Sequence, residues 1–445
     1  MITDSRRVHQ AGPSPKPGGG NIGDPRAITL RGARRRAWLL LLPSAGYWIF
    51  AFANFHFGFL VNPSLSASTY VYLFGCFLAV MLGFSFGVNG GQAARTARAP
   101  RPKVIAFGKV CMVLWVIGMT GLVLDRLRGG NALDLVLEDT ESVRDEVRTS
   151  LITTCFSPLA GLTYIALASY FYAIRWKIRL ARPWHFLMFG GVAGVLCNTF
   201  LSANRGGFVH VILWIAFGII YVKGARLGEL LSFRRHLPPK LAVLAFVVVA
   251  LGYIFFIGRN RVSEGFLRAN TVANVPRYDV ARFFPDDRSY DAFLMLSGYT
   301  TQQFVYIDVI LAEAAPFDFI PYAPIMFYIR QVDRFIPHLY AHAYFAYANR
   351  VEGLGLARSG WPSMFGEGAV DFGYIGFPIL LFLMAHIFGT CAVRFMARGT
   401  LLAGAGAFIF YNYANYSYMS IPGDGSFGIG GLVLLVIFFV ERGGD

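Results

Sequence analysis

Several arginines are predicted to face the outside of a membrane, against the general bias that places Lys and Arg in cytoplasmic loops, so they call for a role. Arg205 lies in the segment SANRGG, and Arg259, Arg261 and Arg268 follow directly after an apolar run. Guanidinium groups bind phosphate oxygens in a bidentate manner and keep their charge. These arginines therefore predict the binding of a phosphate or diphosphate group. The alternative is that they snorkel to lipid headgroups or pair with a local acid such as Glu264.

A pair of acids forms the second candidate group, in the segment GWPSMFGEGAVDFGYIGF at residues 360–377. Glu367 and Asp371 are four residues apart, so they share one face if this segment is helical. A carboxylate can accept the proton of an attacking hydroxyl group, which is the role of a general base. The alternative is structural, with the glycines of the segment packing a helix entry and Asp371 serving as its cap.

Two histidines, His338 and His342 in PHLYAHAYFAY, are also four residues apart. They lack a third ligand for a metal site, so polar packing at the membrane interface is the alternative to a catalytic role for His342. The chain contains no Walker motif, no HExxH motif and no Cys/His zinc pattern. We therefore predict chemistry that needs no metal and no cofactor and is driven by an activated substrate.

Composition identifies the environment in which these residues act. Of the 445 residues, 56% are hydrophobic and only 15% are charged, whereas soluble domains carry roughly 25% charged residues. The formal net charge of +15 does not indicate nucleic acid, because the Arg and Lys residues gather in short clusters between apolar runs. This distribution is typical of a membrane protein, with the lipid bilayer as its partner.

The apolar runs predict an all-α, polytopic fold with about ten transmembrane helices. The runs cover residues 38–56, 68–88, 104–124, 151–174, 184–201, 207–222, 240–258, 372–391, 401–419 and 427–441. Basic clusters precede the first run and follow the second, fourth, sixth and eighth. Since Lys and Arg concentrate in cytoplasmic loops, both termini are expected in the cytoplasm.

This layout divides the chain into four parts. Residues 1–36 are expected to form a disordered basic tail, 37–258 a seven-span region, 259–371 a large extracytoplasmic loop, and 372–445 a three-span region. Asp308, Glu313 and several prolines argue against a lipid-facing span within the loop. We expect helices there that lie at the interface or re-enter it. A crossing by residues 292–314 is the alternative, and it requires a second crossing nearby.

The LSANRGG turn between two apolar runs, the large outer loop and the GEGAVDFGYIGF helix entry together resemble the Wzy-like oligosaccharide repeat unit polymerases of O-antigen and exopolysaccharide pathways. These features cover residues 195–390. The resemblance implies a glycosyltransferase on the outer face of a bacterial inner membrane. It would move a growing glycan from one undecaprenyl diphosphate to another lipid-linked repeat unit.

The resemblance also implies residue roles. Outer-loop arginines are expected to bind the diphosphates, a role that falls here to Arg205, Arg259, Arg261 and Arg268. An Arg-X15-Gly spacing described for such loops occurs at Arg282 and Arg350. The expected reaction is a single, inverting displacement at the anomeric carbon with the lipid diphosphate as leaving group, and Glu367, Asp371 or His342 takes the acceptor proton.

Other functions fit the same layout. O-antigen ligases share the architecture, a polysaccharide or lipid transporter is a second alternative, and a non-catalytic scaffold is a third. Transporters usually place polar groups at the middle of the membrane, whereas here they concentrate at one rim and in one loop. Expected partners of a polymerase are the undecaprenyl-diphosphate-linked oligosaccharide, a chain-length regulator and a flippase.

Overall fold

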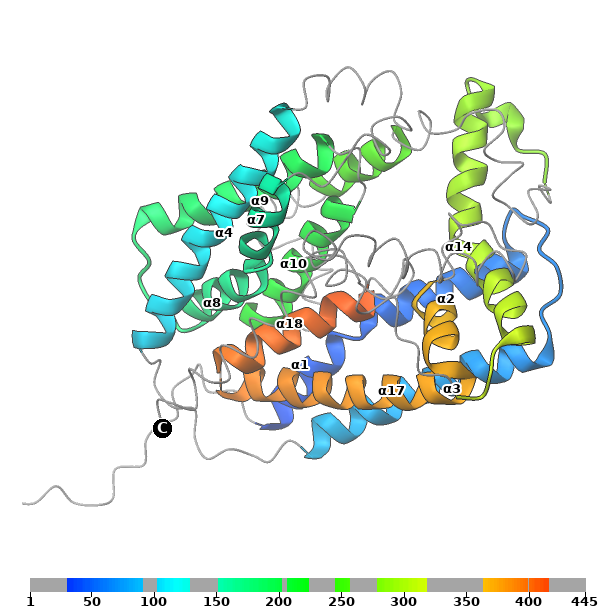
Figure 1. The fold of residues 1–445 in the computed structure, drawn as a ribbon, viewed down its shortest axis with the longest axis horizontal. Helices are drawn as coiled ribbons and strands as arrows, with labels where there is room; N and C mark the ends of the chain where they lie inside the picture. Colours follow the sequence, from blue (N-terminus) through cyan, green and yellow to red (C-terminus); the bar gives the residue numbers. More distant parts are fainter. Residues whose placement is uncertain are drawn as a thin grey trace, which may run out of the picture.

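The computed structural model describes residues 30–90, 102–128, 151–201, 206–223, 245–256, 278–317, 363–398 and 400–415. Its regular elements in these ranges are helices (Figure 1). They are α1 (Leu30–Leu39), α2 (Leu42–Phe57), α3 (Ala67–Gly90), α4 (Pro102–Arg128), α7 (Leu151–Ala160), α8 (Thr163–Arg175), α9 (Arg182–Leu201), α10 (Gly206–Lys223), η1 (Ala281–Phe283), α14 (Asp287–Glu313), α17 (Ser363–Arg398) and α18 (Leu401–Asn415). A further apolar helix covers Ala245–Phe256.

Six helical segments in the described part of the chain are long and apolar enough to cross a membrane. They are Leu30–Phe57, Ala67–Gly90, Ile105–Arg128, Cys155–Arg175, Arg182–Leu201 and Ser363–Ala397. Many of their large apolar side chains point outward; Val71 is 71% exposed and Phe189 is 68% exposed. Such surfaces suit lipid and not water. The all-helical membrane class is therefore confirmed, whereas the count of ten spans stays a prediction, and residues 427–441 lie outside the described residues.

The first span begins earlier than predicted. Helix α1 starts at Leu30, so residues 30–36 are helical and do not belong to a disordered tail. The physical reason is that two arginines of this segment donate hydrogen bonds to backbone carbonyl groups of other helices, which hold the segment in place. Arg34 donates from Nη2 to the Asn89 carbonyl oxygen at 2.9 Å, and Arg36 donates from Nη1 to the Tyr221 carbonyl oxygen at 3.4 Å.

These arginines mark one end of the helix bundle, which we call the arginine-capped end. The carbonyl groups of Asn89 and Tyr221 belong to the last turns of α3 and α10. Arg175, the last residue of α8, donates to the carbonyl group of Met396 near the end of α17 at 2.7 Å. Cationic groups stabilise helix C-termini, where carbonyl groups lack partners within the helix. The start of α1 and the ends of α3, α8, α10 and α17 therefore meet at one end of the bundle. Which side of the membrane this end faces stays a prediction.

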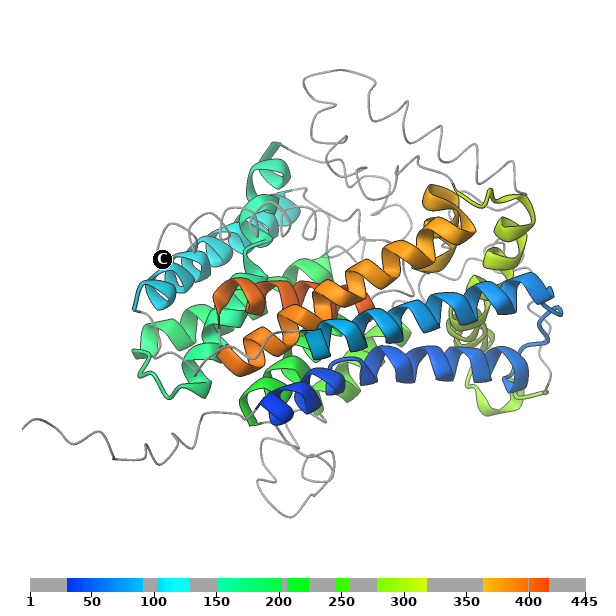
Figure 2. The same ribbon diagram turned by 90° about the horizontal axis from the view of Figure 1, so that it is seen from below.

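Helices α3 and α17 run side by side in the same direction (Figure 2). Gly83 and Gly87 of α3 lie directly against the backbone carbonyl groups of Phe382 and His386 in α17. This is the small-xxx-small arrangement that allows membrane helices to approach closely. At the other end of the pair, the Tyr72 hydroxyl group donates to the Phe365 carbonyl oxygen at 2.7 Å.

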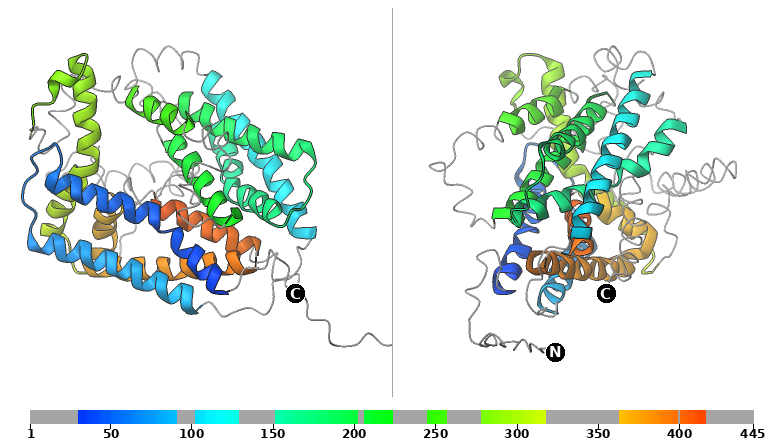
Figure 3. Two further views of the ribbon diagram at one scale, coloured as in Figure 1. Left: turned by 180° about the vertical axis from the view of Figure 1, so that it is seen from behind. Right: turned by 90° about the vertical axis from the view of Figure 1, so that its left-hand side faces the viewer.

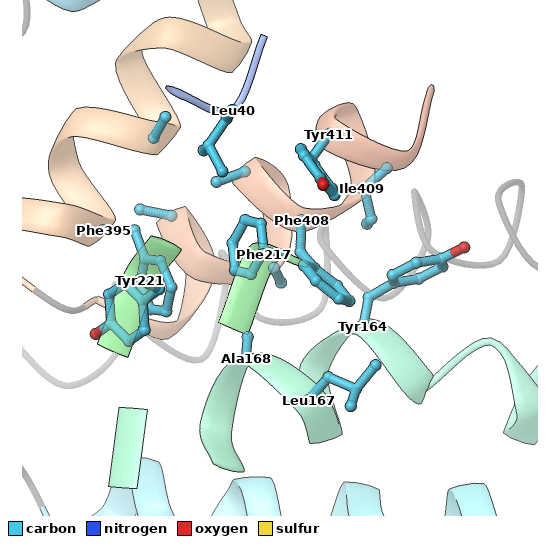
Figure 4. Packing of buried hydrophobic residues seen from close by; sticks show 14 of the residues in the cluster. Leu40, Tyr164, Leu167, Ala168, Phe217, Tyr221, Phe395, Phe408, Ile409 and Tyr411 are labelled. Atoms are coloured by element: carbon cyan, nitrogen blue, oxygen red, sulfur yellow. The ribbon is translucent and has the colours of Figure 1, made fainter. Parts of the chain in front are cut away.

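Aromatic side chains fill the core between α8, α10, α17 and α18 (Figure 4). The rings of Phe217 and Phe408 meet edge to face with centroids 4.4 Å apart, and those of Tyr221 and Phe395 stack at 4.1 Å. Cys76 and Cys111 are buried among apolar neighbours, and all five cysteines are free thiols.

Helix α14 runs across one end of the bundle. Figures 1 and 3 show it steeply inclined to α2, α3 and α17, which lie along one another. It contacts α2 through hydrogen bonds from Asn54 to the Thr300 hydroxyl group at 2.7 Å and from Gln303 to the Tyr47 hydroxyl group at 3.0 Å. It is not among the six candidate spans. Whether this helix lies at the interface, as predicted, or crosses the membrane, as in the alternative, stays a prediction.

Candidate active site

The glycine-rich segment before the eighth predicted span forms a broken helix. Helix α17 begins at Ser363, within the segment predicted as loop, and is interrupted at Gly373. Gly373 has a φ of 78° and ψ of 164°. This conformation is unfavourable for any residue that has a side chain. Residues 363–372 therefore form a short helix that turns into the long one. Gly368 lies against the ring of Phe377, so the short helix packs back on the start of the long helix.

The segment that follows α14 holds this break in place. The N–H group of Tyr374 donates to the Ala315 carbonyl oxygen at 3.1 Å, and that of Ile375 donates to the Pro316 carbonyl oxygen at 2.9 Å. The first N–H groups of a helix have no partner within the helix. Backbone carbonyl groups from outside the helix satisfy them here, and they join the end of α14 to the start of the long part of α17.

Glu367 and Asp371 both lie on the short helix, in a segment that was predicted as the end of the large loop. At their spacing they occupy one helix face. Their environments differ, because Asp371 is fully buried whereas Glu367 is half-buried. The short helix packs against α2 and α3 through Phe365, whose ring meets that of Trp48 at 4.6 Å. Of the two acids, Glu367 is the one that a substrate reaches more easily.

A third acid, Asp308 of α14, lies at the N-terminus of α3. Its Oδ1 accepts hydrogen bonds from the Ser66 N–H group at 2.9 Å, the Ser66 hydroxyl group at 2.5 Å and the Thr69 hydroxyl group at 2.5 Å. A carboxylate at this position satisfies the Ser66 N–H group just before the helix and complements the helix dipole. Burial raises the pKa of Asp308. The hydrogen bonds from Ser66 and Thr69 together lower it by more, so the pKa of Asp308 is below its usual value.

We expect Asp308→Ala to detach α14 from α3 and to lower the free energy of unfolding by about 1–3 kcal/mol. Because the pKa of Asp308 is lowered in the folded state, its contribution is full above the ordinary carboxyl pKa and is lost as the pH falls through the lowered value. Thermal unfolding of purified protein at neutral and acidic pH measures both effects. Glu313→Ala, at the exposed last residue of α14, is the matched control. Equal melting temperatures for the two variants would contradict the capping role.

The described residues bring together only part of the predicted site. Arg282 lies in η1, before the start of α14, and its guanidinium group sits over the exposed ring of Phe283 at 5.1 Å. The acid pair lies near the other end of α14, so Arg282 is not beside it (Figure 1). The remaining predicted residues lie outside the described residues: His342, Arg205, Arg259, Arg261, Arg268 and Arg350.

Two features of the structure were not assigned from the sequence. The sequence marks Asp308 only as a charge that interrupts an apolar run, although Ser66 and Thr69 at the start of an apolar helix are an N-cap signal. Likewise, the sequence places Arg36 and Arg175 in basic clusters that are predicted to be cytoplasmic. It does not indicate that each arginine reaches the end of another helix.

The fold defines an all-helical membrane protein with an acid pair on a short helix at one end of the bundle. Comparison with known proteins adds no family: no family model, no curated protein and no solved structure matches this chain.

Proposed function

We propose that this protein is a glycosyltransferase that polymerises undecaprenyl-diphosphate-linked oligosaccharide repeat units on the outer face of a bacterial inner membrane. The proposal begins from the sequence resemblance to Wzy-like polymerases. The observation that carries it is the acid pair on the short helix of α17, at the end of α3 and α17 opposite the arginine-capped end.

In this proposal Glu367 accepts the proton of the acceptor hydroxyl group, because it is the more accessible of the two acids. Asp371, fully buried beside it, positions the short helix. The outer arginines, Arg205 and Arg261 first among them, stabilise the charge that develops on the leaving diphosphate. Electrostatic stabilisation of this kind is usually the largest contribution to catalysis. The reaction requires neither ATP nor a metal, since the lipid diphosphate is an activated donor.

The position of the acids also bears on the alternatives. A transporter is expected to place its essential polar groups near the middle of the membrane. Glu367 and Asp371 lie instead near the end of the bundle that α14 crosses, where Tyr72 in the first turns of α3 meets Phe365. A ligase would use the same groups on a different acceptor, so the product distinguishes it from a polymerase.

Removing the protein from its host and restoring it on a plasmid tests the proposal. We expect cells without the protein to make glycans of one repeat unit, and the restored wild type to make a ladder of lengths. The double variant Arg205→Ala, Arg261→Ala should leave single units at unchanged protein levels. Arg179→Ala, at an exposed arginine just after α8, is the control and should restore the ladder.

Each contrary outcome has a distinct meaning. An unchanged ladder in cells without the protein would contradict polymerisation. In cells without the protein, a ladder that stays on its lipid carrier would favour a ligase. Repeat units trapped on the cytoplasmic face of these cells would favour a transporter.

A further inference from the structure

The arginine-capped end contains a buried guanidinium group that helix capping only partly explains. Arg175 is 8% exposed, although it carries a full charge. Its Nη2 donates to the Met396 carbonyl oxygen at 2.7 Å, and its guanidinium group lies over the ring of Tyr221 at 4.7 Å. Its Nη1 is also buried, yet it has no hydrogen-bond partner in the part of the chain that the structure describes.

A second guanidinium group lies beside the same tyrosine. Arg36 of α1 donates to the Tyr221 carbonyl oxygen at 3.4 Å, and the charges of Arg36 and Arg175 act on each other. Neither group forms an ion pair with an acidic side chain among the residues described. Two like charges, one of them nine-tenths buried, are strongly destabilising without a counter-charge.

Partial charges from the helices offset some of this repulsion. The ends of α10 and α17 each present about half a negative charge, and they account for the hydrogen bonds from Arg36 and from Nη2 of Arg175. Among the described residues, they leave Nη1 of Arg175 without a hydrogen-bond partner and place no full negative charge next to the pair. A bound anion would supply both.

We propose that Arg36 and Arg175 bind a phosphate-bearing anion, supplied by the headgroup of an anionic phospholipid. Guanidinium groups are the side chains best suited to bidentate contacts with phosphate. The pair lies where apolar helices end, which is the depth of lipid headgroups, and basic pockets between membrane helices bind such headgroups. The site is at the opposite end of α3 and α17 from Glu367, and it does not depend on the proposed enzymatic activity.

Lipid-dependent thermal stability of the full-length protein in detergent tests this site. Phosphatidylglycerol, phosphatidylcholine and inorganic phosphate are each titrated, and the melting temperature is compared with that of the same protein without additive. We expect phosphatidylglycerol to stabilise the wild type and the other two to have little effect. Arg36→Gln should weaken the binding of phosphatidylglycerol by about tenfold or more, as expected for loss of a charged hydrogen-bonding group.

Two further variants make the result decisive. Arg35→Gln is the matched control, because Arg35 is the exposed neighbour of Arg36 on the same helix, and it should bind like the wild type. Arg36→Lys keeps the charge and should bind with intermediate affinity. Equal weakening in Arg35→Gln and Arg36→Gln, or equal stabilisation by phosphatidylcholine, would overturn the proposed site. Stabilisation by inorganic phosphate as large as that by phosphatidylglycerol would overturn the lipid as its source.

Discussion

Replacing Glu367 by glutamine is expected to slow polymer formation by about a hundredfold to ten-thousandfold, the range typical for the loss of a general base. Glutamine has nearly the same shape as glutamate, but its side-chain amide cannot take up the proton of the acceptor hydroxyl group. Because Glu367 is half-buried on the short helix, we expect the variant to fold and to melt like the wild type. The measurement is the initial rate of chain extension by purified protein, alongside its melting temperature.

Asp371→Asn is the matched comparison for Glu367→Gln, four residues further along the short helix. Since Asp371 is fully buried, we expect this change to lower the melting temperature as well as the rate. A Glu367→Gln variant that extends chains at the wild-type rate would assign the proton transfer to another group, and His342 would then be tested first.

The double substitution Gly83→Leu, Gly87→Leu is expected to separate α3 from α17 and to prevent accumulation of folded protein. A side chain added at Gly83 would collide with the Phe382 carbonyl group, and one added at Gly87 would collide with that of His386. These contacts are with helix backbone, which cannot rotate away, so we expect a loss of about 3 kcal/mol or more in the free energy of unfolding.

Gly75→Leu provides the control on the same helix, because nothing lies within 4 Å of the position where its side chain would begin. Size-exclusion chromatography of the detergent-solubilised variants measures the folded fraction. A single folded peak for the double variant, equal to that of Gly75→Leu, would contradict the close packing of α3 on α17.

The sequence predicted the class of fold well because hydropathy and the placement of basic residues are strong signals over long segments. It singled out Glu367 and Asp371 as two acids that share one face if their segment is helical, and the structure makes that segment helical. It did not predict that α17 begins at Ser363 and breaks at Gly373. The chain has 49 glycines, and the sequence does not show which of them adopts a positive φ.

Contacts between distant segments were the least predictable part. The residues around Asp308 do not indicate that its carboxylate reaches the start of α3. Its partner Ser66 is 242 residues away in the sequence. Nor do local patterns show that Arg36 and Arg175 meet at Tyr221. Such contacts depend on how helices pack, and one sequence taken alone contains no direct record of that packing.

The central claim is that this protein joins lipid-linked repeat units, and a reconstituted reaction tests it most directly. Purified protein in lipid vesicles is incubated with the host's undecaprenyl-diphosphate-linked repeat unit, without ATP and with a metal chelator, and the products are separated by gel electrophoresis. We predict a ladder of lipid-linked glycans of increasing length, lost in Glu367→Gln and retained in Gly75→Leu. Unextended repeat units in the presence of folded wild-type protein and its native substrate would contradict the claim.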